Sequence, residues 1–163
     1  MPALIQILWR MLVFPLPPQD CSATCLFVIR EKDGMVILGM LGDGLLAAIK
    51  SDGGVDLLSA NKDESFSNFT ASLSTANPTG DWKIIRSPKS AYRGFLLCTD
   101  GIADDLLPDS VEAFVKASMS HYRNCSKEAL ADDLQRWLDD WPVPGHSDDK
   151  TIACLYQTEE TDE

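Results

Sequence analysis

The chain has 163 residues, of which 45% are hydrophobic, and its formal net charge is −11. A chain of this length can bury one core and is most simply a single domain. The strong negative charge argues against nucleic acid or an anionic membrane surface as the main partner, because both would repel it. An excess of carboxylates is compatible with divalent cations.

The cysteines are odd in number, and no two of them form a C-x-x-C pair. They are Cys21, Cys25, Cys98, Cys125 and Cys154. Three of them lie inside apolar runs, which is typical of buried free thiols in a reducing compartment and predicts a cytoplasmic protein. The sequence therefore predicts neither a disulfide framework nor a zinc site. His121 and His146 are too far apart in sequence to indicate a metal pair.

The N-terminal segment, residues 1–19, is strongly apolar as far as Phe14 and then rich in proline. Its large apolar residues recur at helical spacing, which predicts a short buried helix. The segment is too short to span a bilayer and lacks the basic start and cleavage site of a signal peptide. So much apolar surface suggests that another segment or a partner covers it.

Apolar runs separated by glycine-containing turns follow, and we interpret them as strands over residues 24–30, 35–41, 45–50 and 55–58. The Asp33–Gly34 pair is a strong hairpin signal. We therefore expect one antiparallel meander. The segment Gly42–Asp43–Gly44 is interpreted as a turn, because its spacing is not G-x-G-x-x-G and a strand rather than a helix follows.

The middle of the chain is polar. Residues 59–80 are rich in Ser, Thr, Asn and Asp and are expected to form a loop with one short strand near residues 69–73. Residues 81–86 alternate in polarity, which predicts a strand. We expect this strand to pair with the apolar strand at residues 95–98.

Two amphipathic helices are predicted next, one capped by Asp109 or Ser110 and the other by Ser126. Their aromatic residues need no cofactor to explain them, since they fall on the apolar faces. A final strand is predicted over residues 150–156. The acidic tail, residues 158–163, is expected to be disordered.

An acid cluster follows the apolar strand at residues 95–98. Asp100 comes directly after a strand that reads as buried on both faces, and Gly101 lets the backbone turn tightly. Asp104 and Asp105 follow within about one helical turn. Such a cluster could hold a hard cation, since Mg²⁺ and Mn²⁺ prefer oxygen ligands. The alternative is a turn and a helix whose acidic first turn suits its dipole.

A second acid pair, Asp148 and Asp149, precedes the last predicted strand. If that strand and the strand before Asp100 are antiparallel neighbours, Asp100 and Asp148 lie at the same edge of one sheet. Their Cβ atoms would then be about 5–8 Å apart. Two carboxylates at that separation repel each other unless a cation lies between them. The two pairs together favour the metal interpretation.

Four short motifs occur in the order Ser22–Ala23–Thr24, Leu41–Gly42–Asp43–Gly44, Leu97–Cys98–Thr99–Asp100–Gly101–Ile102–Ala103–Asp104 and Ser147–Asp148–Asp149–Lys150–Thr151. Together they resemble motifs of the metal-dependent type 2C (PPM-type) protein serine/threonine phosphatases. The third resembles the [ST]-D-G-[hydrophobic]-x-[DE] motif of that family, and the fourth resembles its D-[ND]-x-T motif. The resemblance covers residues 20–157, which we take as the domain. It implies an α+β fold, an αββα sandwich of antiparallel sheets with flanking helices.

By this resemblance, Asp100 and Asp148 would be carboxylate ligands of one Mn²⁺ or Mg²⁺ ion, and Asp104 would lie at the rim of the metal site. Residues implied to support the site without binding the ion are Asp149, Gly101, Thr99 and Asp43. The family hydrolyses phosphomonoesters of phosphoproteins with a water activated by two metal ions. No catalytic side chain is therefore expected.

The sequence also departs from the family pattern. The family's early acidic motif and its D-G-x-G-G motif have no counterpart before Asp20, and Arg10 is a poor match for the phosphate-binding arginine. We therefore expect a partial phosphatase domain whose missing ligands come from an upstream segment or another chain. The isolated chain is expected to be inactive. The alternative is a catalytically inactive phosphatase-like module that binds a protein.

Overall fold

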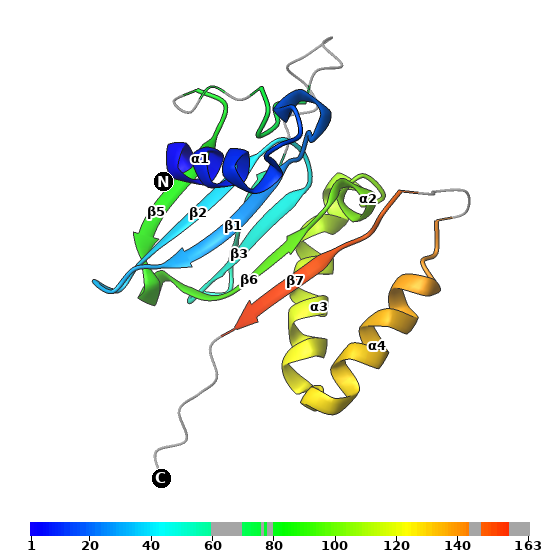
Figure 1. The fold of residues 1–163 in the computed structure, drawn as a ribbon. Coiled ribbons are helices and arrows are strands. Elements are labelled where there is room, and N and C mark those ends of the chain that lie inside the picture. The colour runs from blue at the N-terminus through cyan, green and yellow to red at the C-terminus, as the bar shows by residue number, and fades with distance from the viewer. Residues whose placement is uncertain (60–69, 76, 78–79, 144–147, 157–163) are drawn as a thin grey trace. The chain divides into compact units, whose positions relative to one another are not determined.

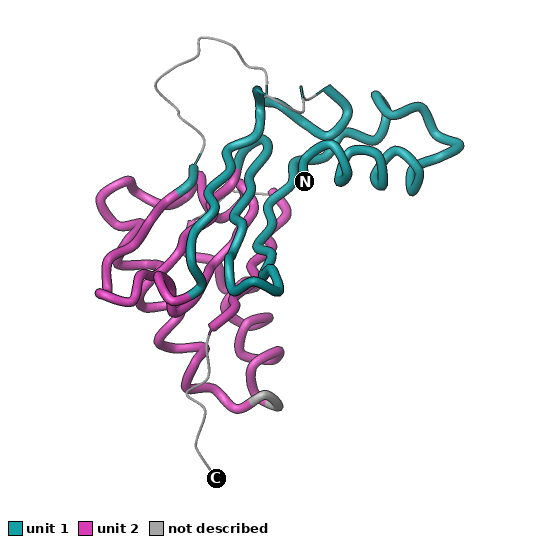
Figure 2. Tube along the Cα trace, turned by 90° about the vertical axis from the view of Figure 1, so that its left-hand side faces the viewer, with its two compact units in different colours: residues 1–43, 58–89 teal, residues 44–57, 90–163 magenta. Residues whose placement is uncertain are grey.

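The computed structural model describes residues 1–59, 70–75, 77, 80–143 and 148–156. Figure 2 shows two units, the first made of Met1–Asp43 and Leu58–Lys89 and the second of Gly44–Leu57 and Ser90–Glu163. The described residues form a three-stranded and a four-stranded antiparallel sheet, together with helices. The predicted α+β class, with antiparallel sheets and flanking helices, is confirmed. The predicted acidic tail lies outside the described residues.

The first unit contains a sheet in the order β1-β2-β5, whose strands are β1 (Cys25–Arg30), β2 (Met35–Leu41) and β5 (Lys83–Pro88). The predicted hairpin between β1 and β2 is confirmed, and Gly34 turns the chain with a φ of +81°. Strand β5 pairs with β2, with Lys83 opposite Met40. The predicted pairing of residues 81–86 with residues 95–98 is therefore wrong. Alternating polarity determines which face of a strand is buried, but it does not identify the neighbouring strand.

Helix α1 (Pro2–Val13) forms where the apolar spacing predicts a helix. Ile5 and Trp9 pack against a small core in the first unit that consists of Leu41, Leu73 and Trp82. Gln6 is buried and its Nε2 donates to the carbonyl of Leu73 at 3.5 Å. The prediction that this helix is buried is otherwise wrong, because many of its large apolar side chains are exposed. These are Leu4, Ile7, Leu8, Met11 and Leu12.

The second unit is built on a sheet in the order β4-β3-β6-β7, whose strands are β4 (Val55–Ser59), β3 (Leu45–Lys50), β6 (Tyr92–Cys98) and β7 (Ile152–Tyr156). The last two residues of β4 belong to the first unit. The last strand is an antiparallel neighbour of the Asp100 strand, with Cys98 opposite Ile152, so the condition on which the shared position of Asp100 and Asp148 depends is met.

Strands β2 and β3 follow each other in the chain but lie in different sheets, so the predicted continuous meander is wrong. Gly42 and Gly44 adopt φ values of +88° and +105° in the turn between them, a conformation that glycine adopts at little cost. Both strands are continuous apolar runs, and each pairs with a later strand instead, β2 with β5 and β3 with β6.

The described part of the second unit contains the α-helices α2 (Asp100–Ala103), α3 (Val111–Asn124) and α4 (Lys127–Asp139). Figure 1 shows α3 beside β6 and β7, with α4 next to α3. Val115 and Met119 of α3 are buried in one cluster with Leu96 and Cys98 of β6. This apolar cluster fixes α3 on the sheet.

The two predicted caps differ. The Oγ of Ser126 accepts a hydrogen bond from the backbone N–H of Ala129 at 3.3 Å, so the cap of α4 is confirmed. Ser110 precedes α3, but its hydroxyl donates to the carbonyl of Leu107 at 2.8 Å and does not cap the helix. A short 3₁₀ turn (Pro108–Ser110) leads into α3 and places that hydroxyl toward the preceding loop.

Further short 3₁₀ turns lie at Pro18–Asp20 and Lys89–Ala91. The predicted strand near residues 69–73 does not form over residues 70–73, and Phe69 lies outside the described residues. Within the described parts of the chain, no helix has the length and apolar character needed to cross a membrane.

The burial of Leu96 leads to a stability prediction. Leu96 is 0% exposed in the core cluster of the second unit, whereas Leu155, on the adjacent strand β7, is 50% exposed. Leu96→Ala should lower the free energy of unfolding by about 2–5 kcal/mol, because it leaves a cavity. Leu155→Ala, the matched control, should cost about 1 kcal/mol or less. Urea unfolding curves measure both, and equal losses would contradict the assigned core.

Candidate metal centre

The candidate centre lies where β6 ends and β7 begins. Beyond the last strand pair, the backbone N–H of Thr99 donates to the carbonyl of Thr151 at 3.1 Å. The N–H of Thr151 donates in return to the hydroxyl oxygen of Thr99 at 3.0 Å, and that hydroxyl donates to the carbonyl of Asp149 at 3.2 Å. Thr99 therefore holds the segment that carries Asp148 and Asp149 beside the start of α2.

Gly101 allows a close backbone approach at this point. A Cβ at position 101 would overlap the carbonyl oxygen of Asp149 and would lie 3.4 Å from the carbonyl carbon of Asp148. Any side chain here would force the two backbones apart. Asp100, directly after β6, and Asp148, shortly before β7, therefore lie at the same end of this strand pair.

The two carboxylates are each held by a local hydrogen bond. Asp100 is half-buried and its Oδ1 accepts from the N–H of Gly101 at 2.9 Å. Asp148 is exposed and its Oδ1 accepts from the N–H of Asp149 at 3.1 Å. Asp104 is exposed at the end of α2. Among the residues that the structure describes, these three carboxylates do not form a group with ligand atoms all within 4.8 Å of one another.

Two contacts at this edge involve residues whose roles the sequence did not reveal. Asp105 accepts a hydrogen bond from the indole Nε1 of Trp141 at 2.6 Å. The Nζ of Lys150 donates to the carbonyl of Asp148 at 3.2 Å and lies 5.8 Å from the centre of the Trp141 ring. No local sequence signal links Asp105 to Trp141. The two residues meet because the chain after α4 packs against the chain after α2.

Asp43 lies in the first unit. Its Oδ2 accepts from the hydroxyl of Thr70 at 3.2 Å. A Cβ on the neighbouring Gly42 would overlap the methyl group of Thr24 and lie 2.8 Å from the carbonyl oxygen of Ala71. The turn around Asp43 is thus packed against the segment that begins β1, which fits a structural role. Ser147 and His146 lie outside the described residues.

The described cysteines are all free. Burial raises the pKa of the Cys98 thiol to about 12 and that of Cys154 to about 11. Both thiols are therefore protonated at neutral pH, and neither can act as a thiolate nucleophile. Among the described residues at the end of β6, the candidate ligands are therefore the oxygen donors.

Those donors are carboxylate and carbonyl oxygens from two chain segments that meet at Gly101. Hard divalent cations such as Mg²⁺ and Mn²⁺ are bound by oxygen ligands, often one or two carboxylates and several waters. The donor chemistry and the close approach at Gly101 fit such an ion, with Asp100 and Asp148 as the residues that would hold it.

A family model described as protein phosphatase 2C matches residues 10–139 of the chain. A comparison with curated proteins found no match. Among solved structures, the serine/threonine phosphatase Stp1 from Staphylococcus aureus is similar with a TM-score of 0.52 and 17% identity, over 85% of this chain and 57% of that one.

Two further solved structures are similar. A bacterial serine phosphatase has a TM-score of 0.50 and 17% identity, over 83% of this chain and 57% of that chain. The catalytic domain of the serine threonine protein phosphatase PstP, in complex with 2 manganese ions, has a TM-score of 0.50 and 14% identity, over 80% of this chain and 56% of that chain. These likenesses concern the fold, and the chain spans little more than half the length of each.

The family match covers most of the chain, and the strand–Thr99–Asp100–Gly101 turn lies beside the Asp148–Asp149 segment as the motif resemblance implies. The chain therefore belongs to the protein phosphatase 2C family.

Proposed function

We propose that this chain forms part of a metal-dependent protein serine/threonine phosphatase that hydrolyses phosphomonoesters on phosphoproteins. The observation that carries the proposal is the placement of Asp100 and Asp148 at one edge of the β6–β7 pair, held there by Thr99 and Gly101. The family membership supports the phosphatase assignment, and the manganese ions in the PstP structure support a divalent metal.

In this proposal Asp100 and Asp148 hold one Mn²⁺ or Mg²⁺, and Asp104 lies at the rim. When bound, such an ion stabilises negative charge on a phosphoryl group and lowers the pKa of a coordinated water. Other residues of the chain hold these ligands in position. Thr99 fixes the Asp148–Asp149 segment, Gly101 permits its approach, and Asp149 orients the turn with its backbone N–H.

The ligand count favours an incomplete centre. A two-metal hydrolase holds its ions about 3.5–4 Å apart with carboxylates that bridge or flank both. Asp100 and Asp148, with Asp104 nearby, can serve one ion with waters. We therefore propose that further ligands come from another segment or another chain. The domain over residues 20–157 and a cytoplasmic location are parts of the same proposal, and the free cysteines support the latter.

Manganese should stabilise the folded chain. At about ten times its Kd, an ion that binds only the folded state adds about 1.4 kcal/mol, which raises the Tm by about 3–6 °C for a protein of this size. Asp100→Asn should remove most of this rise, since it removes a charged ligand. Asp109→Asn, at an exposed acid in the 3₁₀ turn before α3, is the control and should keep it. An unchanged rise in Asp100→Asn, measured by thermal melting, would show that the site is elsewhere.

Gly101→Ala tests the geometry without removing any carboxylate side chain. The added Cβ would push against the backbone carbonyl of Asp149, so we expect a loss of about 1–3 kcal/mol of stability from overpacking. We also expect the manganese-induced rise in Tm to fall by at least half, because Asp148 would be displaced. Thermal melting with and without Mn²⁺ measures both. A full manganese response in this variant would mean that the close approach at Gly101 does not hold the metal ligands.

The isolated 163-residue chain should turn over an aryl phosphate slowly or not at all in the presence of Mn²⁺. Activity should appear when a segment with an acidic D-G-x-G-G motif is joined to the chain or added to it. A colorimetric phosphatase assay measures this directly. Robust turnover by the isolated chain that Asp148→Ala abolishes would show instead that the centre is complete without further ligands.

A further inference from the structure

Three potential metal ligands of different kinds meet where α3 ends and α4 begins. The Nε2 of His121 lies 2.6 Å from an Oδ2 of Asp133, and the Sγ of Cys125 lies 3.7 Å from the same Nε2. All three ligand atoms lie within 4.8 Å of one another. Among the described residues of the chain, this is the one group of three His, Cys, Asp or Glu side chains that is so compact.

The group arises from a tight helical hairpin. His121 lies in the last turn of α3, and Cys125 is the residue directly after the helix, where the backbone becomes extended. Only Cys125 and Ser126 separate α3 from α4, and the Ser126 cap starts α4 at once. The chain folds back so sharply that Asp133, in the second turn of α4, reaches His121. In the sequence alone His121 is isolated, because Asp133 comes close to it only through this hairpin.

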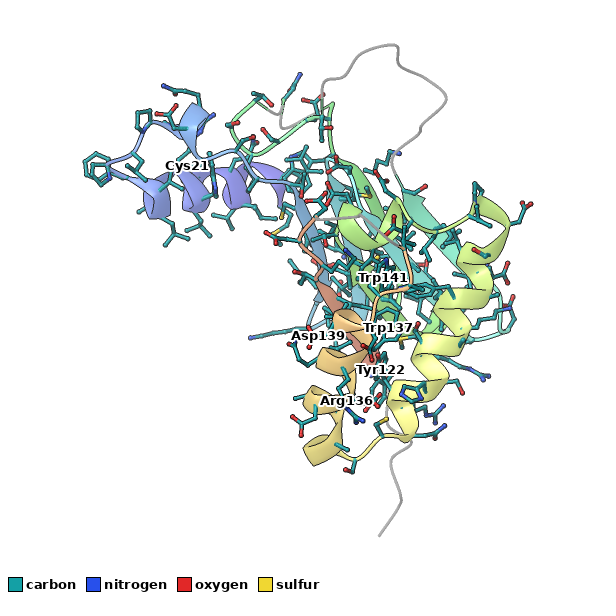
Figure 3. All side chains as sticks on the ribbon, turned by 90° about the vertical axis from the view of Figure 1, so that its right-hand side faces the viewer. Cys21, Tyr122, Arg136, Trp137, Asp139 and Trp141 are labelled. Atoms are coloured by element: carbon teal, nitrogen blue, oxygen red, sulfur yellow. The ribbon has the colours of Figure 1, made fainter. Side chains whose placement is uncertain are left out.

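The surroundings hold these side chains and keep one side open. The Oδ1 of Asp133 lies 3.5 Å from a guanidinium nitrogen of Arg136, and the His121 ring packs edge-on against Tyr122 at 5.0 Å between ring centres. His121 and Asp133 also line a cavity of about 700 Å³ between α3 and α4. In Figure 3, Tyr122, Arg136, Trp137 and Trp141 gather around this region.

We propose that His121, Cys125 and Asp133 form a zinc site with three protein ligands and a fourth position open to water from the cavity. Imidazole, thiolate and carboxylate are the ligands of Zn²⁺ in proteins, and three of them with one open position are a known arrangement. The thiolate favours Zn²⁺ over the hard ions Mn²⁺ and Mg²⁺. This site is separate from the oxygen ligands at the end of β6.

The geometry is close to what zinc requires. With Zn–S of about 2.3 Å and Zn–N of about 2.05 Å, tetrahedral angles place sulfur and nitrogen about 3.6 Å apart, and nitrogen and oxygen about 3.4 Å apart. The Sγ–Nε2 distance is 3.7 Å already, whereas the Nε2–Oδ2 distance is 2.6 Å. Zinc bound to the Nε2 of His121 would replace the hydrogen bond to Asp133, and the Nε2–Oδ2 distance would increase by about 0.8 Å. The neutral imidazole would carry its one proton on Nδ1 and offer the Nε2 lone pair to the ion. The thiol proton of Cys125 would pass to solvent on binding.

A plain hydrogen bond between His121 and Asp133 that ties α3 to α4 is the competing explanation. Substitution of either residue would destabilise the hairpin in both cases, so stability alone does not distinguish them. Cobalt binding distinguishes the two explanations. Co²⁺ can replace Zn²⁺ in zinc sites, and it gives a near-ultraviolet charge-transfer band only when a thiolate is bound to it.

The experiment is a Co²⁺ titration of the reduced, metal-free full chain, followed by absorption. We expect the thiolate-to-cobalt band to saturate at one equivalent and to disappear when one equivalent of Zn²⁺ is added. Cys125→Ser should abolish the band, and Cys21→Ser, at another half-buried free cysteine, should keep it. Asp133→Asn should weaken Co²⁺ binding at least tenfold.

Circular dichroism of Cys125→Ser is the control that tests whether this variant is folded. No band in the wild-type chain, or a band that survives in folded Cys125→Ser, would overturn the zinc site. Asp100→Asn should retain the cobalt band. Absence of the manganese response would therefore contradict the Asp100–Asp148 site, whereas absence of the cobalt band would contradict the zinc site. Loss of the band in Asp100→Asn would overturn the separation of the two sites.

Discussion

The antiparallel pairing of β6 with β7 is the constraint on which the candidate metal centre depends. These strands are distant in sequence, and their register, with Cys98 opposite Ile152, decides which residues meet beyond their ends. A shift of one residue would turn every side chain of β7 to the other face of the sheet. It would also break the hydrogen bonds of Thr99 with Asp149 and Thr151. The buried cluster around Leu96 holds β6 in place and so stabilises this register.

Helices α3 and α4 are connected to the same centre through aromatic side chains. Phe114 of α3 stacks on Trp137 of α4 with 5.9 Å between ring centres, and Trp137 packs edge-on against Trp141 at 4.8 Å. Trp141 in turn donates to Asp105, just after α2. A continuous series of contacts within the second unit therefore runs from the segment after Asp100 to the helical hairpin.

The two metal sites that we propose differ in ligand chemistry. The edge of the β6–β7 pair offers oxygen donors only, which suits a hard ion that keeps several waters. The α3–α4 hairpin offers nitrogen, sulfur and oxygen from His121, Cys125 and Asp133, which suits zinc. In this proposal, the type of ligand at each site selects the metal, a hard ion at the first and zinc at the second.

Much of the local structure is predictable from the chain, and so is the ligand chemistry that we propose for the first site. Apolar periods and turn residues predict α1, the β1–β2 hairpin, α3 and α4, because each of these signals is local. The Asp100 and Asp148 motifs identify candidate ligands, but their shared position follows only if β6 and β7 pair. Tertiary structure alone decided that β5 joins β2, that β2 and β3 lie in different sheets and that α1 is largely exposed. It alone brought Asp133 to His121 and Asp105 to Trp141. Apart from hairpins such as β1–β2, strand partners and contacts between helices depend on the packing of distant residues, and no short pattern in the chain encodes them.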